Sequence, residues 1–234
     1  MMKNDIAPEL LEKLLYEFKE KTKNHERLKE LKEILNSKEA TYKEANEFSI
    51  LVGELLAEVF KENLSSEILP DGKMYFNIAE RVLNGTMKEN YNLVSNYSIE
   101  VQEALNSTAG MGLKAFEPRI NQDRIDGIIG RVSSAEDFDD IKWILDEPVK
   151  NFSQSIVDDF IKKNVEFHND MGLLPKIIRR EAGGCCDWCR ELVGEYEYPN
   201  IPDDIYRRHR YCRCTVDYYP GDGRRQNVHS KKWR

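Results

Sequence analysis

All five cysteines of this 234-residue chain lie in one stretch near its C-terminal end: Cys185, Cys186, Cys189, Cys212 and Cys214. No run of residues has the length and apolarity of a membrane span or a secretory signal, so we expect the chain to remain in a cytosol. In a reducing compartment, clustered thiols indicate metal ligation rather than a disulfide framework. This stretch is therefore expected to fold around a metal ion.

The spacing of the cysteines is typical of a zinc module. Cys186 and Cys189 form a C-x2-C pair, which lets two thiolates of one tight turn converge on a tetrahedral ion. Residues 209–214, His-Arg-Tyr-Cys-Arg-Cys, supply a second half-site with the pattern H-x2-C-x-C. Two half-sites from separate elements are the usual construction of a structural zinc site. We predict a structural zinc ion here.

The segment offers more donors than the four ligands that zinc takes. The candidates are Cys186, Cys189, His209, Cys212 and Cys214. We rank both cysteines of the first pair and Cys212 first, and His209 and Cys214 compete for the fourth position. If residues 209–214 are extended, Cys212 and Cys214 share one face and could bind together, with His209 behind them. Cys185 is expected to be a spectator.

Two other interpretations of the cysteines stay open. Reduced cysteines could simply fill a small core, since free cysteine is often buried. A catalytic zinc would need an open coordination position and a general base, and no H-E-x-x-H or G-x-S-x-G motif occurs. We therefore expect that the protein is not an enzyme and has no small-molecule substrate. The enzymatic alternative is a metal-dependent nuclease in which His209 acts as the base. His25, His168 and His229 are expected at the surface.

Basic residues gather at the end of an acidic chain whose formal net charge is −7. Arg207, Arg208, Arg210 and Arg213 could contact nucleic-acid phosphates, which would make the protein a zinc-dependent nucleic-acid-binding protein. Alternatively, they pair with the acidic body of the same protein, because the net charge repels DNA. The acidic pairs Asp139-Asp140 and Asp158-Asp159 are interpreted as solvated helix faces.

Apolar residues up to about residue 169 recur at helical spacing. Pro8 suits a first helical turn, and Thr41 with Glu44 has the spacing of a capping box at the start of a long core helix. Thr86 with Glu89 repeats that spacing and predicts a new helix start, after a short helix over residues 74–83. Further helices are expected over residues 120–132, 134–143 and 152–171, with Pro148 ending the second of these.

The sequence pattern changes from helical to strand-like after Pro175. We expect one strand in each of the ranges 176–180, 195–198 and 215–219. The fold class predicted is mainly α, a multi-helix body with a small C-terminal module of short β-strands held together by zinc. The body is expected over residues 1–175, the zinc-binding module over 176–219, and a basic tail over 220–234.

The C-terminal motifs resemble those of a known family. Residues 183–189 are Gly-Gly-Cys-Cys-Asp-Trp-Cys, residues 194–196 are Gly-Glu-Tyr, and residues 207–214 are Arg-Arg-His-Arg-Tyr-Cys-Arg-Cys. This pattern resembles the C-x2-C, L-x-G, H-x2-C-R-C ending of minor head proteins of tailed bacteriophages, the Mu-like head-morphogenesis family. Residues 221–223 and 231–233 also look like the tail of prophage versions from Gram-positive bacteria. Arg210 stands where the family usually has proline, and Cys185 is additional.

The resemblance covers roughly the last fifth of the chain. It implies a structural minor capsid protein that acts in head assembly or DNA delivery. The implied location is the virion, inside the capsid near the portal, and the host cytoplasm before assembly. The implied partners are the portal protein, the major capsid protein or both, and contact with packaged DNA is left open. No membrane partner is expected.

Overall fold

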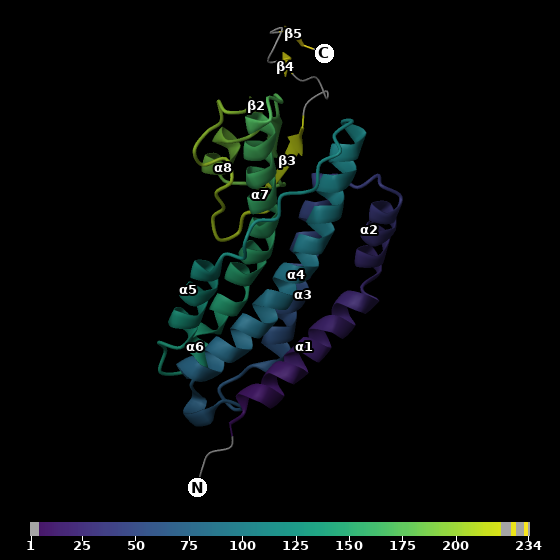
Figure 1. Cartoon of the computed structure of the whole chain (residues 1–234). Coiled ribbons are helices and arrows are strands. Elements are labelled where there is room, and N and C mark those ends of the chain that lie inside the picture. Colours follow the sequence, from purple (N-terminus) through teal and green to yellow (C-terminus); the bar gives the residue numbers. More distant parts are fainter. Residues whose placement is uncertain (1–4, 221–225, 228–231, 234) are drawn as a thin grey trace.

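The computed structural model describes residues 5–220, 226–227 and 232–233. Its helices are α1 (Ala7–Asn24), α2 (Glu26–Asn36), α3 (Tyr42–Asn63), α4 (Phe76–Thr108), α5 (Gln122–Val132), α6 (Phe138–Ile141) and α7 (Glu147–Asp170), with 3-10 turns η1 (Pro70–Gly72) and η2 (Lys142–Leu145). Figure 1 shows α1, α3, α4 and α7 side by side as a long bundle. The predicted mainly helical fold is confirmed. Within the described residues, no helix has both the length and the apolarity to cross a membrane.

Local sequence signals explain where two of these helices begin. Pro8 lies in the first turn of α1, where its missing N–H costs no hydrogen bond. The predicted capping box of α3 is confirmed, because Glu44 accepts a hydrogen bond from the Thr41 backbone N–H at 2.8 Å. The Thr41 hydroxyl in turn accepts from Lys43 N at 3.2 Å. These bonds satisfy N–H groups that have no partner inside the helix.

Two predicted helix boundaries are wrong. Thr86 starts no helix; it lies inside the 33-residue α4, and its hydroxyl donates to the Val82 carbonyl at 2.9 Å. A Thr-x-x-Glu spacing caps a helix only where the chain is not already helical. Pro148 ends no helix either, because it occupies the first turn of α7, where proline is well tolerated.

The C-terminal part contains a three-stranded antiparallel sheet in the order β2-β1-β3. Its elements are β1 (Lys176–Arg180), α8 (Asp187–Glu191), β2 (Gly194–Glu197) and β3 (Thr215–Tyr219). Two of the strands match the predicted ranges, and β2 begins and ends one residue earlier than expected. Ile177, Val216 and Tyr218 share the apolar core of the helices, and β3 packs on α3 and α7. The sheet and α8 lie beside the C-terminal half of α7 (Figure 1).

The predicted basic tail lies largely outside the described residues. Within its described part, β4 (Gln226–Asn227) pairs antiparallel with β5 (Lys232–Trp233). The division into a body, a module and a tail stays a prediction, although the change from helix to strand does fall at Lys176.

Candidate metal centre

The donor atoms of five predicted ligands form two groups that share Cys189. Cys186, Cys189 and His209 make one group, and Cys189, Cys212 and Cys214 make the other. Within each group the donor atoms lie within 4.8 Å of one another. Cys186 is the N-cap residue of α8 and Cys189 lies on that helix, while the other donors come from residues 209–214, before β3. The structure thus brings the two predicted half-sites together.

The spacing of the thiols fits a tetrahedral ion. The Sγ atoms of Cys189 and Cys212 are 3.7 Å apart. Two thiolates that each lie about 2.3 Å from a tetrahedral zinc are about 3.8 Å apart, whereas a disulfide bond is about 2.05 Å long. All five cysteines lie in the described part of the chain, and none forms a disulfide. A cluster of this kind can hold a metal ion.

Burial separates the donors into an inner and an outer set. Cys189, Cys212 and Cys214 are buried, while Cys186 is exposed. His209 is half-buried; its Nε2 is shielded from solvent and has no hydrogen-bond partner among the described residues. A metal ion would give that nitrogen a partner. Cys185 belongs to neither group, and its thiol donates to Glu181 at 3.2 Å.

Burial sets the electrostatics of the inner thiols. Burial, together with the neighbouring Cys212, raises the pKa of the Cys189 thiol well above its ordinary value. Burial acts in the same direction on Cys214, but hydrogen bonds from the Ala182 backbone and the other thiols outweigh it and lower its pKa. For all three of these groups to be thiolates side by side, nearby positive charge would be required. The inner set therefore suits a cation that accepts thiolate ligands.

One positive charge already lies next to the thiols. Arg179, on β1, is 1% exposed, and its Nη2 lies 3.8 Å from the Sγ atoms of both Cys189 and Cys212. The same nitrogen donates to the Arg207 carbonyl at 3.0 Å, and Nη1 donates to the Ile205 carbonyl. Arg179 thus joins the sheet, the thiols and the loop before the second half-site.

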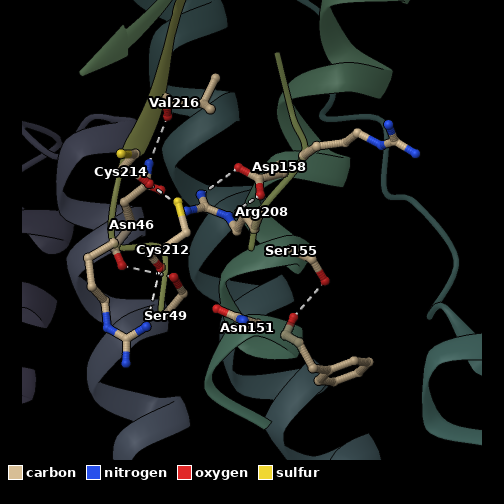
Figure 2. Close-up of polar contacts among 12 residues, drawn as sticks. Asn46, Ser49, Asn151, Ser155, Asp158, Arg208, Cys212, Cys214 and Val216 are labelled. Atoms are coloured by element: carbon tan, nitrogen blue, oxygen red, sulfur yellow. Dashed lines mark hydrogen bonds and ion pairs between the residues drawn. The ribbon is translucent and has the colours of Figure 1, made fainter. Parts of the chain in front are cut away.

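Arg208 holds that loop against α7 through a buried ion pair. Its Nε and Nη2 contact the two carboxylate oxygens of Asp158 at 2.5 and 2.8 Å, and both side chains are at most 3% exposed. Its Nη1 donates to the Cys214 carbonyl (Figure 2). When the side-chain amide of Gln154 is oriented so that both its nitrogen and its oxygen have partners, its nitrogen donates to the Cys212 carbonyl at 3.0 Å. The backbone of two inner ligands is thereby fixed to the helical body.

Further contacts continue this attachment. Asn46 of α3 donates to the Val216 carbonyl at 2.7 Å, as Figure 2 shows. Arg213 pairs with the buried Glu147 at 3.0 Å, and Asn151 donates to the His209 carbonyl at 3.1 Å. The candidate ligands are therefore positioned from α3, α7 and the sheet at once.

The four arginines predicted to touch nucleic acid have different surroundings. Arg208 and Arg213 pair with the acidic body, which is the alternative that the sequence left open. Arg207 pairs with Asp204 at the surface, and the Arg210 guanidinium lies 4.1 Å from the Trp143 ring centroid. Nucleic-acid contact by this set stays a prediction, but the Arg208 guanidinium is fully engaged within the protein.

Two other surface predictions are wrong. Asp158 is buried against Arg208 rather than solvated. His168 is also buried, and its Nδ1 shares a hydrogen bond with the Tyr218 hydroxyl. His25 instead caps α2 by accepting from Leu28 N, and His229 lies outside the described residues. The nuclease hypothesis for His209 stays untested.

Arg179 and Asp158 are the site residues that the sequence analysis missed. Arg179 follows Ile177 by two residues in a strand, which places both on the same sheet face. Asp158 lies three residues before the buried Ile161 on the inner face of α7. In both cases a charged residue occupies an apolar stripe, and that signal was available.

Comparisons with models of protein families, with curated proteins and with solved structures found no match for this chain. The likeness of its Cys/His pattern to minor head proteins therefore stays a prediction from the sequence.

Proposed function

We propose that the chain is a non-enzymatic structural protein whose C-terminal segment is closed by one zinc ion. The observation that supports this most directly is the buried set of Cys189, Cys212 and Cys214, with two thiols at the separation of tetrahedral ligands. Thiolate and imidazole ligands suit zinc. Either Cys186 or His209 completes the site, because each lies in the group that shares Cys189.

A closed set of four protein ligands makes the ion structural. It leaves no position for water or substrate, and it supplies on the order of 10 kcal/mol of folding free energy to a segment that has only a small apolar core. Arg179 balances part of the thiolate charge, and Arg208 and Gln154 hold the ligand backbone.

The biological role we propose is that of a bacteriophage minor head protein. Its support is the resemblance of residues 183–214 to the C-terminal motif of that family, together with a helical body of plausible length. In this role the body docks on portal or capsid subunits inside the virion, and the zinc ion keeps the C-terminal segment attached to it.

Elemental analysis of protein purified without chelator tests the metal site. We expect one zinc ion per chain, lost in Cys189→Ser, Cys212→Ser and Cys214→Ser. Cys186→Ser and His209→Ala identify the fourth ligand, since only one of them should lose the metal. Cys185→Ser is the matched control and should keep it. Native protein that never contains metal would contradict the site.

Co-assembly tests the role separately. The chain would be co-expressed with the portal and major capsid proteins of its own phage, and the particles sedimented. We expect a few copies per particle, bound to the portal. A chain that contains zinc but sediments with neither protein would refute the role and leave the metal site standing.

A further inference from the structure

A second candidate site is a cavity of about 540 Å³ between α5, η2, α7 and the turn at Arg210. Arginines stand around it and apolar side chains form much of its lining. The residues that matter here are Arg124, Arg131, Arg210, Ile128, Ile144 and Phe152. A cavity of this size, apolar with a few convergent polar groups, is typical of a small-ligand site.

All the charged side chains that line this cavity are positive. None of the described residues that line it carries a carboxylate. Arg208 reaches its edge but is neutralised by Asp158. Arg124, Arg131 and Arg210 form no ion pair with any described residue, although the chain carries a net charge of −7 and many of its other arginines are paired. Arg124 also interacts electrostatically with Asp159, which lies outside this lining, so Arg131 and Arg210 are the least compensated of the three. Like charges around one cavity predict an anionic ligand.

Two of these guanidinium groups are held by the same ring. Arg210 and Arg131 lie 4.1 and 5.3 Å from the Trp143 ring centroid. A guanidinium that rests on an aromatic ring keeps its N–H edge available for a phosphate oxygen. The Arg210 backbone is fixed as well, because Asn151 donates to its carbonyl at 2.9 Å. The arginine rim is therefore largely preorganised.

One polar amide residue also lines the cavity. The Oδ1 atom of Asn151 has no hydrogen-bond partner among the described residues, and Asn151 is part of the lining. Because this oxygen is closed to solvent, the match to a ligand rests on the arginines and the apolar lining, which together suit negative charge beside an apolar part.

We propose that this cavity binds a nucleoside phosphate, either a free nucleotide or the end unit of a nucleic acid. Three arginines around one cavity match the charge of a polyphosphate better than that of a single carboxylate. The apolar floor at Ile128, Ile144 and Phe152 receives the base or sugar. The proposal does not depend on the zinc site.

The test is calorimetric titration of the full chain, as purified, with ATP, inorganic triphosphate and a 5′-phosphorylated oligothymidylate. Arg124→Gln, Arg131→Gln and Arg210→Gln should each weaken ATP binding about tenfold, the effect of losing one charge-assisted contact. Arg119→Gln is the matched control, an exposed arginine outside the cavity, and should change affinity less than twofold. Circular dichroism and metal content, measured on the same samples, show that each variant is folded and loaded.

Comparison of the three probes shows whether the ligand is a free nucleotide or the end of a nucleic acid. Tighter binding of ATP than of the oligonucleotide assigns the cavity to free nucleotides, and the reverse assigns it to nucleic-acid ends. Equal affinity for triphosphate and ATP would overturn the proposal, because the apolar floor would then contribute nothing to the binding of the base or sugar. No detectable binding of ATP or of the oligonucleotide would also overturn it, as would equal losses in the Arg119→Gln control.

Discussion

The helical body and the C-terminal segment of residues 176–219 are stabilised by different means. The body buries a continuous apolar core, and its buried polar side chains are mostly hydroxyls and amides. The buried charges that the structure describes belong to the segment or face it: Arg179 and Asp217 lie in the segment, and Glu147 and Asp158 of α7 pair with its arginines. The inner thiols belong to the segment too. The body is thus stabilised mainly by apolar burial, whereas the segment is attached to it through buried charged pairs as well as shared core residues and, in our proposal, is held by a metal ion.

Removal of the metal should give the largest difference in stability between the body and the segment. We expect a chelator to leave the helical signal in circular dichroism largely intact while residues 176–219 become sensitive to protease, because the proposed zinc ion would supply on the order of 10 kcal/mol to the segment that carries its ligands. Limited proteolysis with mass spectrometry locates the cleavage sites. Unchanged cleavage, or loss of the whole helical signal, would show that the two regions are not stabilised separately.

The buried ion pair between segment and body should give the next largest effect. Asp158→Ala leaves the Arg208 guanidinium buried without its partner, which we expect to cost about 3–5 kcal/mol in urea denaturation. Asp187→Ala removes the same side chain from an exposed pair with Arg190 and should change stability little. Similar losses in the two variants would argue against a special role for the buried pair.

Arg179 should matter for the metal more than for the body. Arg179→Met removes the positive charge beside Cys189 and Cys212, and we expect metal affinity to fall about tenfold, as for other residues that support ligands. Arg179→Lys keeps the charge and should recover part of that loss. Affinity is measured by competition with a chelating dye. An Arg179→Met protein that binds metal as tightly as the wild type would remove Arg179 from the site.

Asp217 makes the segment sensitive to pH. Burial raises its pKa from 3.8 to about 6, so the folded state binds the proton more tightly than the unfolded state. Its contribution to stability therefore falls as pH rises from about 4 to 6. Asp217→Asn cannot titrate and should add about 1–2 kcal/mol at pH 7. Thermal denaturation of variant and wild type side by side across this range measures the difference, because any loss of metal at low pH is common to both; parallel curves would contradict the assignment.

The body was more predictable from the sequence than the segment, for a physical reason. Helical stripes and the capping box at Thr41 are local patterns, and the half-sites at Cys186 and His209 are short motifs. The pair of Arg208 and Asp158 joins positions 50 residues apart, which no local pattern encodes. Local patterns also mislead where context overrides them, as the Thr86 spacing does inside α4.

That last contrast can be measured with one substitution at two places. Glu44 and Glu89 occupy the same position of the same Thr-x-x-Glu spacing, and both are half-buried. Glu44→Ala removes the acceptor of the Thr41 backbone N–H, so we expect a loss of about 1 kcal/mol in urea denaturation. Glu89→Ala lies within a continuous helix, where alanine is the better helix former, and should cost nothing measurable. Equal losses would mean that the glutamate at Thr41 acts through something other than the cap.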